Sequence, residues 1–382
     1  MHSAVKLTCV GMLALLAGCS SLNPFASKPP PRNPPAALQD FDAKLQVRTA
    51  WSMQIGAAKS FTFTPAPAGD SLYVAAADGS VARLDAGTGR TLWRIDAGAP
   101  LTAGVGADTH TVAVVADQGV VMAFDTDGKQ RWTAQASSEV LSAPAVGQGV
   151  VVVRSIDNRI AAYDAETGER RWIVQRTAPS LTLRSAPGIE IADQTAFVAL
   201  PGGRLSALAL ANGAPRWEAA VGDARGTTEL ERIADMSGAP VIAGNDVCAV
   251  AYQGRVACFD LVSGTPRWAR EMASEVGVGV DARFVYVVDR NSAVNAFTRA
   301  AGVSVWRNDR LANRRLSTPA PLDRAVAVGD YQGYIHFLSR DDGALVARVS
   351  TDGSLVKAAM PVADRMAVFQ TQDGTVAALV IE

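Results

Sequence analysis

The chain has 382 residues, 48% of them hydrophobic, and its 36 basic and 37 acidic side chains leave a formal net charge of −1 at pH 7. About 340 residues follow the N-terminal export and linker segments described below, which is enough for one large domain with a sizeable core. The near-neutral charge argues against a general nucleic-acid surface or a broad face for anionic lipids.

Residues 1–18 have the pattern of a bacterial lipoprotein signal peptide. Lys6 precedes the apolar run 11–18, which is too short to span a bilayer as a stable helix. The run ends in Leu16-Ala17-Gly18-Cys19, which resembles the lipobox whose cysteine is lipidated and becomes the mature N-terminus. Ser20 follows in place of an aspartate, and in such lipoproteins this implies sorting to the outer membrane. We expect a protein on the periplasmic face, held to the membrane by its lipid anchor only.

Residues 19–40 are rich in proline, serine and asparagine, with Pro29-Pro30-Pro31 and Pro34-Pro35 in succession. This composition predicts an extended, semi-rigid tether. At about 3.1 Å per residue, it would hold the globular part up to roughly 60 Å from the anchor. We expect residues 41–382 to form a single domain.

A repeat of short strands fills that domain. In the first unit, an apolar strand over 72–77, the turn Asp78-Gly79, a strand over 80–84 and a second turn ending in Gly89 precede Trp93. Aspartate and glycine tolerate the positive φ that two-residue hairpins demand. The corresponding positions along the chain are Trp51, Trp93, Trp132, Trp172, Trp217, Trp268, Trp306 and Ala347. Successive positions lie 42, 39, 40, 45, 51, 38 and 41 residues apart.

A period near forty residues with several strands per unit predicts an all-β fold, an eight-bladed β-propeller of four-stranded antiparallel blades. Eight hairpin turns recur, but the eighth, Asp373-Gly374, reaches the C-terminus at Glu382 without room for a closing strand. We therefore expect an N-terminal strand containing Trp51 to complete the last blade and remove its exposed edge. The tryptophans are interpreted as plates between blades, each indole N–H bonded to the backbone. The carboxylates of the second turns are expected to bond their own turn amides.

Two cysteines, Cys248 and Cys258, flank the Gln253-Gly254 turn. A two-residue turn pairs Cys248 with Phe259, one register step from Cys258, so a disulfide would need a shifted register. We therefore favour two small buried thiols over a disulfide, although the periplasm is oxidising.

Two connections between units are longer than the others. The next strand signal begins ten residues after Trp132, but thirteen after Trp172 and twenty-one after Trp217. All three run from an outer strand to the inner strand of the next blade, on the face that carries the hairpin turns. Both enlarged loops should therefore lie side by side on that face, and function is favoured where a regular pattern breaks.

The first long loop contains Leu181, Leu183 and Arg184. The two leucines alternate, so they would share one side of an extended segment with the arginine at its edge. Exposed leucines beside an arginine suit the docking of a protein partner. The alternative is that both leucines pack into the neighbouring blade.

The second long loop predicts a short helix, because Thr228 and Glu231 fit a capping box. Leu230 and Ile233 would pin this helix to the propeller, leaving Glu229, Arg232 and Asp235 facing outward as further candidate partner-binding residues. The alternative is a solvated helix face with incidental charges. A third cluster, Arg310, Arg314 and Arg315, is expected to be a solvated loop.

Little in the sequence indicates catalysis. Only His110 and His336 remain after signal-peptide removal, and no metalloprotease motif, nucleophile elbow, phosphate loop or metal-spaced Cys/His set is present. We expect no catalytic residues, no metal and no cofactor, with a carboxylate pair assembled by the fold as the open alternative.

The Asp-x-x-Thr-Gly-x-x-x-Trp repeats resemble those of the pyrroloquinoline-quinone (PQQ) enzyme superfamily, whose dehydrogenases are typically larger. Many of those enzymes carry adjacent cysteines beside the quinone, and this chain has no Cys-Cys pair. The lipobox, the tether, Thr49-Ala50-Trp51, the eight compact repeats and the loops 180–187 and 226–232 together resemble the BamB family of outer-membrane β-barrel assembly lipoproteins. The resemblance covers essentially the whole mature chain.

The resemblance implies a non-enzymatic scaffold that binds a periplasmic POTRA domain of the barrel subunit BamA and aids insertion of outer-membrane proteins. It implies contact with the other assembly subunits through BamA, with unfolded outer-membrane proteins as a further candidate partner. The family's partner-binding positions fall on Leu181, Leu183, Arg184 and Asp235, whereas a second acidic position falls on Ser237. The alternatives are a PQQ-dependent dehydrogenase and a lipoprotein that binds peptidoglycan or other periplasmic proteins.

Overall fold

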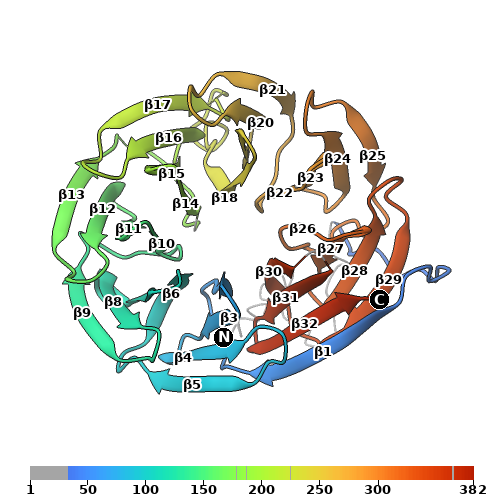
Figure 1. The fold of residues 1–382 in the computed structure, drawn as a ribbon. Coiled ribbons are helices and arrows are strands. Elements are labelled where there is room, and N and C mark those ends of the chain that lie inside the picture. The colour runs from blue at the N-terminus through green and yellow to red at the C-terminus, as the bar shows by residue number, and fades with distance from the viewer. Residues whose placement is uncertain (1–32, 178, 186, 224, 364) are drawn as a thin grey trace, which may run out of the picture. The chain divides into compact units, whose positions relative to one another are not determined.

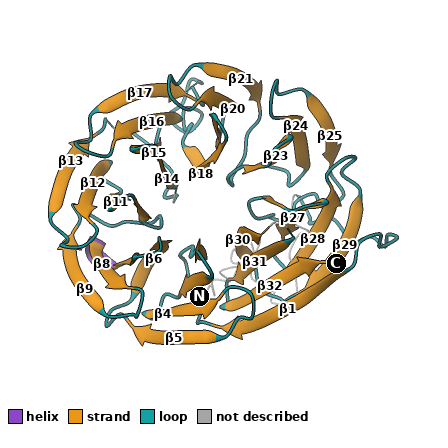
Figure 2. Ribbon diagram, viewed as in Figure 1, coloured by secondary structure: helices purple, strands orange, loops and turns teal. Residues whose placement is uncertain are grey.

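The computed structural model describes residues 33–382 except 178, 186, 224 and 364, so the signal peptide, Cys19 and most of the tether lie outside the described residues. The compact unit Pro35–Glu382 is a ring of eight four-stranded antiparallel sheets, which confirms the predicted propeller (Figure 1). The only helical element in the described part is one 3-10 turn, η1 (Asp117–Gly119) (Figure 2). No helix in those ranges is long and apolar enough to span a bilayer.

The first seven blades each run along the chain from the innermost to the outermost strand. The strands of blades 1 to 4 are β2 (Ala66–Ala68), β3 (Ser71–Ala75), β4 (Ser80–Asp85), β5 (Thr91–Asp96), β6 (Leu101–Ala107), β7 (Thr111–Ala116), β8 (Val120–Asp125), β9 (Gln130–Gln135), β10 (Ala145–Gly147), β11 (Val150–Arg154), β12 (Arg159–Asp164), β13 (Arg170–Gln175), β14 (Ile189–Ala192), β15 (Thr195–Leu200), β16 (Arg204–Ala209) and β17 (Pro215–Ala220). The strands of blades 5 to 7 are β18 (Met236–Ala243), β19 (Asp246–Ala251), β20 (Arg255–Asp260), β21 (Pro266–Glu271), β22 (Gly279–Val280), β23 (Phe284–Val288), β24 (Val294–Thr298), β25 (Ser304–Asn308), β26 (Ala320–Pro321), β27 (Ala325–Gly329), β28 (Tyr334–Ser339) and β29 (Leu345–Ser350).

Blade 8 joins the two ends of the chain. Its strands are β30 (Val356–Ala363), β31 (Met366–Thr371), β32 (Thr375–Ile381) and, outermost, β1 (Val47–Gln54). Strand β1 pairs antiparallel with β32, from Val47 opposite Ile381 to Gln54 opposite Thr375. The N-terminal strand therefore closes the ring as predicted, and the C-terminal strand has no free edge (Figure 1).

All seven tryptophans join neighbouring blades, as the sequence predicts. Each indole N–H donates to a backbone carbonyl in the second turn of the next blade, from Trp51 to Ala86 O at 3.0 Å through Trp306 to Arg340 O at 2.8 Å. The glycine that ends each of these turns lies against the same indole. A Cβ built on Gly302 (φ +62°) would be 2.3 Å from the Trp268 ring, so the tryptophan and the glycine of the repeat form one contact across two blades.

Ala347 takes the eighth marked position because blade 8 has no such turn. Its outermost strand comes from the N-terminus, so no covalent turn and no glycine are available for a tryptophan to cover. The N-terminal segment occupies this place: the amides of Lys44 and Leu45 donate to Val346 O at 3.0 and 3.2 Å, and Leu45 packs on the cluster that contains Ala347.

The hairpin register differs from the expected two-residue turn. In all eight hairpins the pairing is symmetric about a residue, as when Ala75 lies opposite Val81 across Asp78. A connection of three residues has this symmetry, whereas a two-residue turn is symmetric about a peptide bond. The strand positions were predicted correctly, but every cross-strand partner is displaced by one residue.

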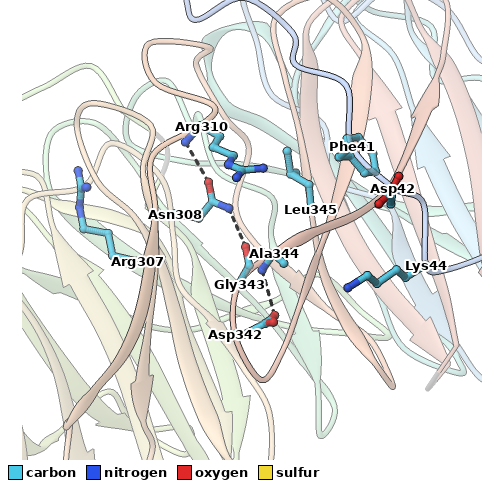
Figure 3. Close-up of a pocket in the computed structure, with 10 residues that line it drawn as sticks. All are labelled: Phe41, Asp42, Lys44, Arg307, Asn308, Arg310, Asp342, Gly343, Ala344 and Leu345. Atoms are coloured by element: carbon cyan, nitrogen blue, oxygen red, sulfur yellow. Dashed lines mark hydrogen bonds between the residues drawn. The ribbon is translucent and has the colours of Figure 1, made fainter.

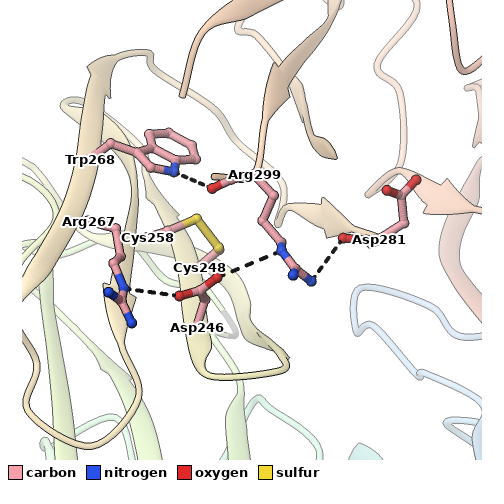
Figure 4. The surroundings of a disulfide bond; sticks show 7 residues. All are labelled: Asp246, Cys248, Cys258, Arg267, Trp268, Asp281 and Arg299. Atoms are coloured by element: carbon pink, nitrogen blue, oxygen red, sulfur yellow. Dashed lines mark hydrogen bonds and ion pairs between the residues drawn. A yellow bond between two sulfur atoms is a disulfide. The ribbon is translucent and has the colours of Figure 1, made fainter. Parts of the chain in front are cut away.

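This register corrects the prediction for the cysteines. Strands β19 and β20 are separated by Tyr252–Gly254, which places Cys248 directly opposite Cys258 with their Cα atoms 4.0 Å apart. The two side chains form a buried disulfide. On either side of it, the Asp246 carboxylate and the Trp268 indole N–H both contact Arg299, which ties blade 5 to blade 6 (Figure 4). The thiols are buried as expected, but the preference for unpaired cysteines is wrong.

The expectation of a solvated arginine cluster is correct for Arg310 and Arg315, which are exposed, but wrong for Arg314. Arg314 is 2% exposed and its guanidinium binds the buried carboxylate of Asp330 at 2.6 Å and the carbonyl of Ala36 at 2.9 Å. Arg348 similarly donates to Gln39 O at 3.0 Å and lies over the ring of Phe41. The N-terminal segment is therefore attached to the propeller from Ala36, before the strand that the sequence indicates at Val47.

The turn carboxylates act as structural acceptors, as expected. Asp164 accepts from Arg171 at 2.7 Å and from the amides of Thr167 and Glu166, and these bonds lower the pKa of Asp164 to about 2. Asp85 and Asp260 bind the hydroxyl and amide of the third residue after them, which also lowers their pKa.

Candidate functional site

The two enlarged connections lie together, as the spacing predicts. The first loop, residues 176–187, links β13 to β14, and the second loop, residues 221–235, links β17 to β18 in the next blade (Figure 1). The Ser180 hydroxyl donates to the Glu229 carboxylate, and the Leu183 amide donates to Asp235 at 2.5 Å. These two contacts join the loops into one surface.

Both loops share a face with the hairpin turns. The amide of Arg176 donates to Asn158 O at 3.1 Å in the β11–β12 hairpin. The amide of Tyr252, in the β19–β20 hairpin, donates to Asp235 O at 2.8 Å. The expected placement of the loops is therefore observed.

Asp235 does not face outward, contrary to the expectation. Its side chain is only 2% exposed, and its two oxygens accept from the amide of Leu183 and, at 2.8 Å, from the amide of Gly202. The reason is local: Asp235 immediately precedes β18, so the chain has already turned into the blade at this point. A direct contact of Asp235 with a partner stays a prediction, but its geometry is that of a clamp that positions the first loop.

The helix predicted in the second loop is not formed, and residues 229–232 make one hydrogen-bonded turn instead. Thr228 and Glu231 do form the reciprocal capping box, with Thr228 N to Glu231 Oε2 at 3.1 Å and Glu231 N to Thr228 Oγ at 3.3 Å. One i to i+4 bond, from Arg232 N to Thr228 O, follows before the chain descends to Asp235. Leu230 consequently does not pin the loop to the propeller and is 69% exposed.

Three other charged residues of the two loops, Arg184, Glu229 and Arg232, lie at the surface. Glu229 and Arg232 are exposed and pair with each other at 3.4 Å. Arg184 is exposed and pairs at 2.6 Å with Glu139, a residue of the preceding connection that sequence reasoning did not single out. An ion pair between exposed groups contributes little to stability, so these charges are available to a partner.

The sequence left open whether the two leucines of the first loop are exposed or packed into the neighbouring blade, and the structure gives a different answer for each. Leu181 is 43% exposed, whereas Leu183 is partly buried beneath the loop. Sequence reasoning also missed Ile156, which is 49% exposed in the neighbouring hairpin. An apolar residue beside the Asp157-Asn158 turn was the signal that could have found it.

A cavity of about 280 Å³ lies under the first loop. Its walls include Ile156, Leu183, Pro187 and Pro201, and its polar lining includes Arg154, Arg184 and Asp235. Arg154, the last residue of β11, is 6% exposed, and burial lowers its pKa to about 10 despite the opposing attraction of Asp235. A charged residue at the end of a strand is usually exposed, so nothing in the sequence indicated that Arg154 would be buried.

Another hollow, of about 430 Å³, lies where the N-terminal segment passes blades 6 and 7, lined by Phe41, Lys44, Arg307, Asn308 and Arg310 among others (Figure 3). It contains none of the predicted site residues. Within the described ranges, no group of three or more His, Cys, Asp or Glu side chains could hold a metal ion. Of the two histidines among the described residues, His110 is exposed and His336 is buried against Asp330.

Replacing Asp235 with alanine is expected to free the first loop without unfolding the ring. The change removes two charge-assisted bonds, so amide hydrogen exchange in residues 179–187 should accelerate about 10- to 100-fold. Ser237→Ala is the matched control, because Ser237 is also buried but donates to Ser274 O, away from this loop. Exchange measured by mass spectrometry that is equal in the two variants would contradict the clamp.

Comparison with known proteins gives one consistent family. The family described as "Outer membrane protein assembly factor BamB" matches residues 77–308 and 290–382. The chain is 45% identical over 375 residues to the protein of that name from Bordetella pertussis, covering 98% of this chain and 95% of the relative. It is 42% identical to the one from Burkholderia pseudomallei (98% and 97% covered) and 31% identical to the one from Escherichia coli (97% and 98%).

Solved structures agree. The crystal structure of BamB from Moraxella catarrhalis superposes with a TM-score of 0.80 at 25% identity, covering 88% of this chain and all of that one. The quinohemoprotein alcohol dehydrogenase from Comamonas testosteroni superposes with a TM-score of 0.66 at 15% identity, covering 89% of this chain and 78% of the enzyme, and shares the fold alone.

Proposed function

Because the chain belongs to the family of the outer membrane protein assembly factor BamB, we propose that it is a scaffold that binds a periplasmic POTRA domain of the barrel subunit BamA through its two joined loops. The observation that carries this proposal is the surface of those loops. Exposed Leu181 and Leu230 lie on loops joined through Ser180 and Glu229, with exposed Arg184 close by. Apolar side chains rimmed by charge, on a rigid ring, suit docking of a folded domain.

The same proposal places the protein at the outer membrane. Lipidation of Cys19 would anchor it there, and the propeller would lie on the periplasmic side, where the barrel subunit exposes its POTRA domains. The scaffold would bring the other assembly subunits into contact through BamA. It acts without catalysis in this proposal, since the likeness to quinohemoprotein dehydrogenases concerns the fold and supplies no site residues.

The substitution Arg184→Glu tests the docking surface. Charge reversal places a second carboxylate beside Glu139 at the rim of the proposed contact, so co-purification of BamA from envelopes should fall at least about tenfold. Arg283→Glu is the matched control, because Arg283 is equally exposed and pairs with Asp341 in another part of the ring. Unchanged co-purification of BamA with Arg184→Glu, while the propeller stays folded, would count against this docking site.

A further inference from the structure

Arg154 lies at the floor of the cavity under the first loop without a full set of partners. Its side chain is more than nine-tenths buried, and its Nε atom has no hydrogen-bond partner. Among the described residues, no carboxylate lies within ion-pair distance of its guanidinium. A buried guanidinium whose Nε lacks an acceptor is costly, so the presence of arginine at this position needs a physical reason.

Unsatisfied polar atoms concentrate in and beside blade 3, the blade that supplies Arg154 to this cavity. Of the seven buried side-chain nitrogen and oxygen atoms that lack a partner in the described chain, five belong to Ser142, Arg154, Asn158 and Arg176. Three of the five are arginine nitrogens, which can only donate. All four residues belong to blade 3 or to the connections at its ends, directly beside the first loop. Of these atoms, Arg154 Nε is the one that belongs to the cavity lining, where it is a buried donor without an acceptor.

The carboxylates nearby are already engaged. Both oxygens of Asp235 accept backbone amides, from Leu183 and Gly202. Glu139 binds Arg184 at 2.6 Å at the rim. Of the charged residues that line the cavity, only Arg154 is left with a buried hydrogen-bonding atom that has no partner. What the cavity lacks is one anion that can accept hydrogen bonds.

We propose that this cavity receives a carboxylate side chain of the protein partner, with Arg154 as the group that binds it. A guanidinium presents parallel donors that match a carboxylate in a bidentate pair. The apolar walls, Ile156, Leu183, Pro187 and Pro201, suit the methylene groups of an aspartate or glutamate side chain. This inference deepens the proposed function and rests on it: the loops provide the apolar contact, and Arg154 provides a buried, specific one.

The proposal has two opposite consequences for Arg154→Met, which keeps an unbranched, flexible side chain and removes the charge. Binding should weaken because the partner's carboxylate loses the guanidinium that donates hydrogen bonds to it. The free propeller should become no less stable, since a buried charge without a full set of partners has been replaced by an apolar side chain. An arginine with a purely structural role would give the reverse pattern.

Titration calorimetry with the purified periplasmic domain of BamA, alongside thermal unfolding of the free protein, tests this. We expect Arg154→Met to weaken binding about 30-fold or more with an equal or higher melting temperature. The affinity of Arg154→Lys should lie between those of the wild type and Arg154→Met. In wild-type protein, the Nε–H resonance of Arg154 should shift when the domain is added, a readout that needs no variant.

The outcomes are distinct. If wild-type protein binds, but Arg154→Met binds equally well or the Arg154 resonance does not move, the carboxylate site is overturned and the loop-docking proposal stands. If wild-type protein does not bind the domain at all, the proposed function fails and the carboxylate site fails with it. Loss of binding with a preserved fold, together with the resonance shift, supports both.

Discussion

Deleting residues 47–55 is expected to abolish cooperative folding of the whole propeller. The deletion removes β1, which pairs with β32 from Val47 to Gln54, and Trp51, whose indole N–H bonds to Ala86 in blade 1. Blade 8 would lose its outer strand and the contact that joins the last blade to the first. Each blade is stabilised mainly by its neighbours, so an open seam weakens every blade rather than one.

Circular dichroism and thermal unfolding provide the measurement. The expected result for the deletion is the loss of a single cooperative transition, and for Trp51→Ala alone a loss of about 3–5 kcal/mol. Removal of residues 21–32, which the composition assigns to the tether, is the control and should leave the melting temperature unchanged. A normal transition in the 47–55 deletion would show that the ring does not depend on its seam.

Asp330→Asn is expected to destabilise the propeller by about 3–5 kcal/mol. The Asp330 side chain is fully buried and accepts from Arg314 at 2.6 Å and from His336 Nε2 at 2.9 Å, as well as from the amides of Gln332 and Tyr334. The amide keeps the shape but leaves the Arg314 guanidinium buried without a counter-charge. Because Arg314 also holds Ala36, the N-terminal segment should become accessible to protease in the same variant.

His336 is the control for this network and shows its pH dependence. Burial lowers the pKa of His336 below the ordinary value of 6.5, although Asp330 opposes the shift, so the neutral ring is favoured in the folded state. A lowered pKa means that this stability is present above pH 6.5 and is lost as the pH falls.

Urea unfolding should therefore give a lower free energy of unfolding at pH 5 than at pH 7.5 in the wild-type protein. In His336→Gln, which retains a donor for Asp330, this loss should be reduced, while stability at pH 7.5 changes much less than in Asp330→Asn. Equal acid sensitivity of the wild type and His336→Gln would contradict a buried neutral imidazole.

The ring itself could be predicted from residues because the repeat carries its own contacts. A tryptophan four residues after a turn glycine recurs in the sequence, and in the structure the tryptophan of one blade covers the glycine of the next. The count of eight hairpins against seven closing strands likewise required a strand around Trp51. These features depend on local patterns repeated many times, so each repeat checks the others.

The details of the site could not be predicted in the same way. The burial of Asp235, the partial burial of Leu183 and the position of Arg154 depend on how two loops fold over a neighbouring hairpin, and these loops occur once each. The predicted strand register was wrong for a related reason. A hairpin turn of two residues and one of three residues give nearly the same sequence pattern. That single step decided whether Cys248 faces Cys258 or Phe259.

The sequence by itself thus determined the number of blades, the strand that closes them and the face on which two enlarged loops meet, because periodicity and chain connectivity are properties of the sequence. Only the tertiary structure decided which loop residues are exposed, which acid clamps the loops and which arginine is left without an acceptor. Burial and pairing are set by the neighbours that a side chain meets in space, and at this site those neighbours come from four separate segments of the chain.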